Sequence, residues 1–436
     1  MTPAFDTLDA RGSDRVQSQA RKAAIGSFVG AVVDWYDFLL YGIVAALVFN
    51  AEFFPKISPA MGTLAAFATF GVGFLFRPLG GIVFGHYGDR LGRKRMLVLT
   101  VMLMGVSTVA IGLLPTFVTI GWWAPVLLVA MRALQGFAVG GEWGGAALMA
   151  VESAPQKHKA FYSSGVQVGY GVGLVLATGI VSILNHTLGE AAFKSWAWRL
   201  PFVLSIVLVL IGLWVRKNMD ESQEFLEKVE HAKHKVRLPV LEAMTRHPKA
   251  FLLIVALRLA ELFTMYIVTA FALSYSTANL GMSRDLFLNI GLLVGAVSCL
   301  TIPCFAWLAD RYGLRRIYLI GALVGLASAV PFFLALEARS ILWIVIFSLL
   351  LANLAHDMIV SVQQPLFTEL FGAEYRYSGA GVGYQFASVV GGGFTPFIAV
   401  ALVTFGNGSW HLVAGYLAIG CLISFVVAAR MRVVRH

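Results

Sequence analysis

Charge is scarce in this sequence, and so are cysteine and the familiar nucleotide and hydrolase motifs. Charged residues make up 13% of the 436 residues, whereas an ordinary soluble domain carries about a quarter. The three cysteines show no CxxC spacing and all fall within apolar stretches, which argues against a disulfide framework or a metal site. A GxxxxGK[ST] loop, an HExxH helix and a GxSxG turn are missing as well. We therefore expect no enzyme, no cofactor, no metal and no direct drive by ATP.

Long apolar stretches take the place of charge. Hydrophobic residues make up 58% of the chain and the mean hydropathy is +0.79. A helix that crosses a bilayer needs about 20 apolar residues, and such stretches recur along the sequence with short polar links between them. The strict alternation of β-barrel strands is absent from the sequence, so all are predicted to be helices. Twelve spans are expected: 23–50, 60–87, 96–114, 121–150, 161–185, 197–216, 250–279, 286–308, 317–336, 341–371, 376–405 and 409–430.

The basic residues predict the orientation of these helices. The net charge is +10, but 25 of the 33 Lys and Arg residues lie in the two tails and the even-numbered links, counting Arg216, Arg376 and Arg430 at the edges of their spans. The odd-numbered links hold only four. Because cytoplasmic loops are enriched in Lys and Arg, both termini are expected in the cytoplasm. The charge thus reflects topology, and nucleic acid is not an expected partner.

The chain divides into two related halves. A basic loop from Gly85 to Arg95 has a second copy around Asp310 and Arg311, 221 residues later, and a Tyr-Ser motif at Tyr162 has an echo at Tyr377. Repeated halves with a site between them are common among transporters. We expect a cytoplasmic tail (1–22), a six-helix bundle (23–217), a cytoplasmic linker (218–249), a second bundle (250–431) and a short cytoplasmic tail (432–436). The fold class predicted is an all-α membrane protein with two six-helix pseudo-repeats.

Ionisable residues inside the predicted spans are few and regularly placed. Each costs roughly 2.5 to 3.5 kcal/mol at the bilayer centre on insertion scales, so their positions point to function. They gather in the first helix of each three-helix group, with Arg77 in the second helix as the main exception, and we expect those first helices to line a central cavity. The residues are Asp34 and Asp37, Arg132 and Glu142, Arg258 and Glu261, His356 and Asp357.

Two of these sites suggest proton coupling and anion binding. Asp34 and Asp37 are three residues apart, share a helix face with Tyr41, and are candidates to carry a proton; a structural pairing of one of them with an arginine is the alternative. Arg132 is the first candidate to bind a carboxylate, because a guanidinium can donate two parallel hydrogen bonds to it, and Gln135 lies one turn away. An internal ion pair is the alternative for Arg132.

The other charged positions have simpler alternatives. Arg258 and Glu261 can neutralise each other within one helix, whereas His356 with Asp357 could relay protons or only hydrogen-bond a neighbouring helix. Glu142 and Glu261 remain candidates for proton coupling, and Arg258 for substrate binding. Polar side chains suited to a hydroxylated ligand are Gln167, Tyr170, Tyr384 and Gln385.

Several of these stretches resemble a known family. The loop from Gly85 through Asp89, Arg90, Gly92 and Arg93, and the Arg132-xx-Gln135-Gly136 segment, resemble the signatures of the major facilitator superfamily. The segments 34–42 and 135–146 are similar to those of its metabolite:proton symporter family, and the similarity extends over almost the whole chain. It implies a monomeric, multi-pass protein of a bacterial inner membrane that imports a small hydroxylated carboxylate with protons.

The resemblance also implies a conformational latch on the cytoplasmic side. In the superfamily the loop aspartate, here Asp89, holds the two halves together near the end of helix four, here Glu152. The second copy, with Asp310 and Arg311, departs from the pattern at Ala306 and Leu314, which weakens its expected role. Alternatives to carboxylate import are the same machinery with a dicarboxylate, another aromatic acid or a zwitterionic osmolyte, and a membrane sensor that no longer transports.

Overall fold

The described part of the chain is built from helices. The structure, a computed structural model, describes residues 25–91, 93–152, 159–217, 248–368, 370 and 376–431, with the side chains at 85, 88–91, 93, 143–152, 368 and 376–380 outside the description. Twelve helices in this part are long and apolar enough to cross a membrane. The predicted number of spans is therefore confirmed, and each predicted span overlaps one of them.

The first six spans come in sequence order, with short helices between some of them. Those spans are Ile25–Phe53, which ends in the π-helical turn η1 (Ala45–Phe49) and α2 (Asn50–Phe53), then α3 (Pro59–Leu75) with α4 (Arg77–Leu91), α5 (Arg93–Leu113), α7 (Trp123–Glu152), α8 (Lys159–Leu188) and α10 (Arg199–Lys217). The short elements are α6 (Phe117–Ile120), α9 (Glu190–Ala192) and η3 (Phe193–Ala197).

The last six spans contain three further π-helical turns. These six spans are α13 (Pro248–Tyr266) with η4 (Ile267–Phe271) and α14 (Ala272–Ala278), α15 (Arg284–Tyr312), α16 (Leu314–Glu337), α17 (Ile341–Leu349) with η5 (Leu350–His356) and α18 (Asp357–Thr368), α19 (Arg376–Ser388) with η6 (Val389–Gly393) and α20 (Thr395–Phe405), and α21 (His411–Arg430). The three turns are η4, η5 and η6. Such turns inside α-helices are frequent at functional sites.

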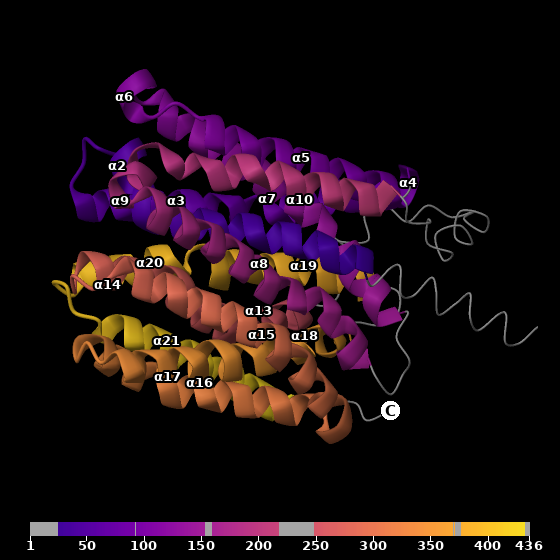
Figure 1. The fold of residues 1–436 in the computed structure, drawn as a ribbon. Helices are drawn as coiled ribbons and strands as arrows, with labels where there is room; N and C mark the ends of the chain where they lie inside the picture. Colours follow the sequence, from indigo (N-terminus) through magenta and orange to yellow (C-terminus); the bar gives the residue numbers. More distant parts are fainter. Residues whose placement is uncertain are drawn as a thin grey trace, which may run out of the picture.

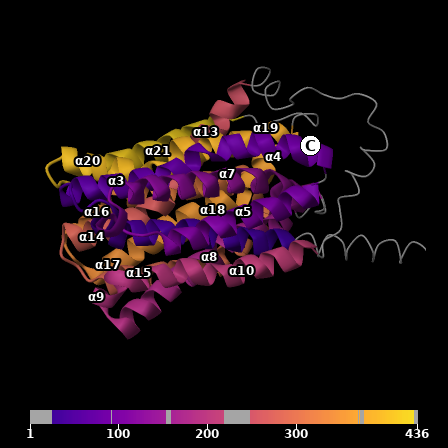
Figure 2. The same cartoon turned by 90° about the horizontal axis from the view of Figure 1, so that it is seen from above.

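The helices before the central gap and those after it lie on different sides of the molecule. In Figure 1 the helices up to α10, coloured indigo to magenta, lie mostly above those from α13 onward, coloured orange to yellow. Helices α8 and α15 lie side by side where the two groups meet, as Figure 2 also shows, and α19 contacts α4 and α7 from the other group. Side chains from both groups therefore meet along the middle of the molecule.

Glycines bring α7 unusually close to the second span. A Cβ at Gly136 would collide with the backbone of Gly73, and a Cβ at Gly140 would collide with the backbone of Arg77. Small residues four apart allow membrane helices to approach at backbone distance. The second span is also interrupted at Phe76, between α3 and α4, directly before Arg77 and Pro78. These contacts fix the backbone position of Arg77 against α7.

Candidate functional site

A buried polar cluster surrounds Arg132. The Oδ1 atom of Asp37 accepts hydrogen bonds from Thr108 Oγ1 at 2.5 Å and from Gln135 Nε2 at 3.0 Å. Arg132 Nη1 donates to Gln135 Oε1 at 3.1 Å and lies 3.8 Å from the second oxygen of Asp37, with both side chains almost fully buried. Arg132 is thus part of an internal ion pair in this conformation, the alternative considered from the sequence.

Aromatic rings enclose the same guanidinium. Its central carbon lies 4.0 Å from the ring centre of Phe38, 4.2 Å from that of Tyr41 and 5.0 Å from that of Phe70. The hydroxyl of Tyr41 is hydrogen bonded to Thr69 at 2.6 Å. Cations are attracted to the faces of such rings, most strongly where water is excluded. Arg132 and Tyr41 are therefore sealed among side chains and do not face an open space.

A pocket lies beside Phe38. Its lining comes from the first, second, fourth, fifth and eleventh spans, and the space between them, with the open solvent at its mouth, amounts to about 530 Å³. We expected the first helix of every three-helix group to line the cavity; the seventh and tenth spans contribute none of these lining residues. The lining comprises Ser27, Ala31, Asp34, Trp35, Phe38, Arg77, Val139, Glu142, Val166, Gln167, Tyr384 and Gln385.

Asp34 and Asp37 occupy different surroundings although they are three residues apart. Asp34 is partly exposed and lines the pocket, and its Oδ1 atom is buried with no hydrogen-bond partner among the residues described. Asp37 faces Thr108, Gln135 and Arg132 instead. One acid can therefore exchange a proton with the pocket, whereas the other serves as the counter-ion of a buried arginine.

Glu142 has a partner that the sequence pattern did not reveal. It forms an ion pair with Arg216, whose Nη1 atom also donates to the carbonyl oxygen of Leu97 at 2.7 Å. Because Arg216 ends the sixth predicted span, its charge was expected to belong to the following cytoplasmic link. Its side chain is only 4% exposed. A count of loop charges misses a basic residue that ends a span but whose side chain turns toward the interior.

The second half holds Arg258 in a network where each of its three guanidinium nitrogens has a partner. Arg258 and Glu261 form two parallel hydrogen bonds of 3.0 Å. Arg258 Nη1 also donates to the carbonyl oxygen of Tyr384 at 2.8 Å and to Ser388 at 2.5 Å, while Gln363 donates to Glu261 at 2.9 Å. The guanidinium carbon lies 3.4 Å from the ring centre of Tyr384. This arrangement is the mutual neutralisation considered from the sequence.

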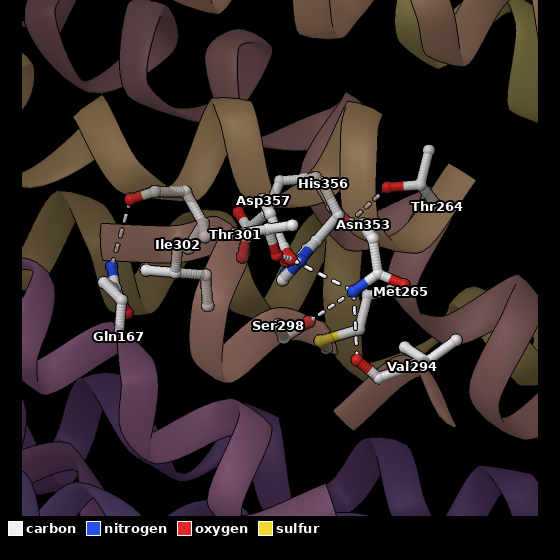
Figure 3. Close-up of polar contacts among 12 residues, drawn as sticks. Gln167, Thr264, Met265, Val294, Ser298, Thr301, Ile302, Asn353, His356 and Asp357 are labelled. Atoms are coloured by element: carbon white, nitrogen blue, oxygen red, sulfur yellow. Dashed lines mark hydrogen bonds and ion pairs between the residues drawn. The ribbon is translucent and has the colours of Figure 1, made fainter. Parts of the chain in front are cut away.

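His356 and Asp357 form the third buried cluster, drawn in Figure 3. His356 Nδ1 lies 2.8 Å from Asp357 Oδ1, and the other carboxylate oxygen accepts from Thr301 at 2.5 Å and from Asn353 at 3.2 Å. Asn353 also donates to Ser298 at 2.9 Å. The Nε2 atom of His356 has no partner among the described residues. Asp357 is thus well satisfied, whereas the outer nitrogen of His356 is not.

Four polar candidates from the sequence lie where the two groups of helices meet. The ring of Tyr170 lies 4.7 Å from that of His356, centre to centre, and Gln167 Nε2 reaches the carbonyl oxygen of Val360 at 3.5 Å. Gln167, Tyr384 and Gln385 line the pocket. Within the described structure, Gln385 Oε1 and the Tyr170 hydroxyl are buried without a hydrogen-bond partner. Such atoms are available to a hydroxylated ligand.

The second basic loop contacts α8 directly. The two carboxylate oxygens of Asp310 accept hydrogen bonds from the backbone N–H groups of Ala160 at 3.0 Å and Phe161 at 2.9 Å, at the start of that helix. Arg311 lies instead over Trp307 and Tyr312 of its own segment. The first loop cannot be compared, because Gly92 and the side chains at Gly85, Asp89, Arg90, Arg93 and Glu152 lie outside the described residues.

Sequence comparison decides the family. The family profile described as Major Facilitator Superfamily matches residues 27–396 and 262–436. The chain belongs to the Major Facilitator Superfamily. A 72% identity over 95% of both chains relates it to the shikimate transporter of Escherichia coli strain K12. The relatives compared are superfamily transporters, so the chain is a multi-pass membrane transporter and not an enzyme.

Other superfamily members resemble the chain less. The inner membrane metabolite transport protein YhjE of the same E. coli strain is 37% identical over 98% of both chains, and the proline/betaine transporter of Salmonella typhimurium is 32% identical over 94% of this chain and 83% of its own. Among solved structures, the partially occluded inward-open form of the xylose transporter XylE from E. coli has a TM-score of 0.73 at 17% identity, covering 94% of this chain and 97% of its own. This likeness establishes the fold.

Proposed function

We propose that the protein is a shikimate:proton symporter of a bacterial inner membrane. The observation that carries the proposal is the 72% identity to the E. coli shikimate transporter over 95% of both chains. Shikimate is a small hydroxylated carboxylate. The described part of the chain offers matching chemistry in one place: a pocket with an arginine, two acids, two glutamines and a tyrosine in its lining.

The proposed mechanism is alternating access between two six-helix pseudo-repeats. The two bundles are residues 23–217 and 250–431. The linker (218–249) and both tails (1–22 and 432–436) face the cytoplasm. The transporter works as a monomer. An even number of spans places both ends of the chain on one side of the membrane, and the bias of Lys and Arg selects the cytoplasm. Rocking of one bundle against the other would expose the pocket to each side in turn.

Asp34 is the acid that we propose exchanges the coupling proton. It lines the pocket, and no ion pair with a described basic residue neutralises it. A protonated Asp34 can donate a hydrogen bond to an incoming carboxylate, whereas an ionised one repels it. Proton uptake thereby favours substrate binding, and proton loss on the cytoplasmic side favours release. Asp37 then keeps its place beside Arg132 throughout the cycle.

The remaining acids receive other roles in this proposal. Glu142 and Glu261 keep arginine partners and hold helices together, while His356 and Asp357 orient Asn353 and Tyr170 toward the substrate path. Asp310 latches the bundles at one end, since a carboxylate at a helix N-terminus is favourable. Asp89 and Glu152 form the matching latch predicted from the sequence.

Uptake of radiolabelled shikimate into proteoliposomes tests the function. The proposal expects concentrative uptake with an inward proton gradient and only equilibration without it, with little competition from quinate, α-ketoglutarate or proline betaine. A second candidate function is osmolyte transport, which the 32% identity to the proline/betaine transporter supports. Gradient-driven uptake of proline betaine in place of shikimate would favour it. Uptake of none of these solutes would overturn both.

A further inference from the structure

We propose that Arg77, and not Arg132, is the side chain that holds the substrate carboxylate. This inference rests on the proposed function, because it requires an anionic substrate in the pocket. It assigns a carboxylate site to the one residue that interrupted the regular charge pattern of the sequence. The site is bounded by Arg77 and Asp34, by the ring of Phe38, and by Gln385 from the other bundle.

Arg77 differs from the other inward-facing arginines in its partners. Arg132 pairs with Asp37, Arg216 with Glu142, and Arg258 with Glu261. Among the residues that the structure describes, no carboxylate lies within ion-pair distance of Arg77. Arg77 is nevertheless only 8% exposed. Its Nε atom is buried without a described hydrogen-bond partner, as are Nε and Nη2 of Arg132, so the missing counter-ion and the place in the pocket lining are what set Arg77 apart. A buried guanidinium without a counter-ion is costly unless a ligand supplies the negative charge.

Two aromatic rings hold the guanidinium of Arg77 in place. Its central carbon lies 4.0 Å from the ring centre of Phe38 and 3.9 Å from that of Phe74. Gly140 packs against the backbone of Arg77 and fixes its position against α7. A guanidinium can bind a carboxylate through two parallel hydrogen bonds, and Nε of Arg77 has no partner among the described residues.

Arg132 contacts the same ring but lies outside the pocket lining. Its guanidinium carbon is also 4.0 Å from the ring centre of Phe38, but Arg132 is fully buried. It is also engaged with Asp37 and Gln135. Arg77 already lines the pocket.

The rest of the pocket lining offers polar partners for the remainder of a hydroxylated acid. Gln385 Oε1 is buried without a partner in the described structure and belongs to the lining, as does Gln167. These amides can bind hydroxyl groups while Arg77 binds the carboxylate. The other charges in the lining are Asp34 and Glu142, the latter paired with Arg216.

Binding of shikimate and of its uncharged methyl ester separates the two arginines. The purified full-length protein is assayed with radiolabelled shikimate, and the ester is measured as a competitor, for the unaltered protein and for Arg77→Gln, Arg77→Lys and Arg132→Gln. Arg339→Gln serves as a matched control, because it removes one positive charge from an exposed loop. The unaltered protein should prefer the acid to the ester.

The expected result is a loss of this preference in one variant. Arg77→Gln should weaken shikimate binding by about 10- to 100-fold, the usual range for hydrogen bonds to a charged group, and leave the ester within about threefold of the unaltered protein. Arg77→Lys, which keeps the charge but loses the two-pronged geometry, should fall between. Arg132→Gln and Arg339→Gln should keep the preference.

The contrary results are distinct. Unchanged discrimination in Arg77→Gln or Arg77→Lys, or its loss in Arg132→Gln alone, would overturn the assignment to Arg77 while leaving the transport function intact. If the unaltered protein bound no shikimate, the proposed function itself would fail. Should Arg77→Gln not fold, Arg77→Lys carries the test: equal acid-to-ester preference in that variant and in the unaltered protein contradicts the inference.

Discussion

Charged side chains have different partners in two regions of this transporter, one in each half. In the second half, Arg258 and Glu261 satisfy each other and are further held by Tyr384, Ser388 and Gln363. In the first half, Arg77 and Asp34 lie beside one pocket and form no ion pair with a described residue. A buried charge with every hydrogen bond made is a structural element. A charge that faces a pocket without an ion-pair partner can bind a ligand or exchange a proton.

The largest effect on stability is expected at Arg258, whose guanidinium nitrogens all have partners. Replacing Arg258 by Gln strands the carboxylate of Glu261, and breaking a buried ion pair from one side typically costs about 3 to 5 kcal/mol. We expect a large drop in the thermal midpoint of the purified protein. The double variant Arg258→Gln with Glu261→Gln should recover much of that loss. A single variant as stable as the unaltered protein would contradict the structural role of this pair.

A smaller effect is expected at the counter-ion of Arg132. Asp37→Asn keeps the shape of the side chain but removes the negative charge beside the guanidinium, which should cost about 2 kcal/mol of stability, within the range for hydrogen bonds to charged groups. Shikimate accumulation should still require the proton gradient. Gradient-independent equilibration by folded Asp37→Asn would instead identify Asp37 as the proton carrier.

The contact between Asp310 and α8 should have a moderate effect on conformation. Asp310→Asn removes the charge that faces the first N–H groups of α8, an interaction worth about 0.3 to 1 kcal/mol near a surface. The balance between inward- and outward-facing states should shift by up to about fivefold toward opening at that end. Labelling of a cysteine introduced in the pocket measures the shift. Asp285→Asn is the matched comparison: it weakens the contact with Asn185 of α8 at the opposite end of α15, so it should not favour opening at the Asp310 end. No change in labelling rate would remove Asp310 from the latch.

The smallest effect is expected at the surface pair of Glu190. A hydrogen bond from Lys194, with the nearby charge of Arg284, lowers the pKa of this carboxyl below its usual 4.5. Its contribution to stability is therefore present above the pKa of the unfolded chain and is lost as the pH falls through the lower folded value. Because the side chain is 59% exposed, Glu190→Gln should cost less than about 1 kcal/mol at pH 7. The difference from the unaltered protein should vanish in acid; a difference that grows in acid would contradict it.

The helical fold could be predicted from hydropathy alone, and the inner site could not. Apolar stretches of about 20 residues predict twelve spans because a bilayer demands that length. The position of the pocket depends instead on which helix faces meet, and this follows from close contacts such as Gly140 against Arg77. Sequence spacing placed Asp34 and Asp37 on one face, yet the neighbouring helices divide them between a pocket and Arg132.

Arginine roles were the hardest to predict. Arg132 carried the family signature and was therefore the first candidate for the carboxylate, although the structure surrounds it with Asp37, Gln135 and three aromatic rings. Arg216 was grouped with the loop charges because it ends a span, but it turns inward to Glu142. Ion-pair partners that lie 74 residues apart, as Glu142 and Arg216 do, or 95 residues apart, as Asp37 and Arg132 do, leave no periodic signal in one sequence.

Proton movement during shikimate uptake tests the central claim most directly. Proteoliposomes loaded with a pH-sensitive dye receive external shikimate without an imposed gradient, and interior pH and labelled uptake are followed together for the unaltered protein, Asp34→Asn and Asp37→Asn. We expect interior acidification with uptake for the unaltered protein and for Asp37→Asn, and shikimate entry without acidification for Asp34→Asn. Equal acidification in Asp34→Asn would contradict the claim that the unpaired acid of the pocket carries the proton.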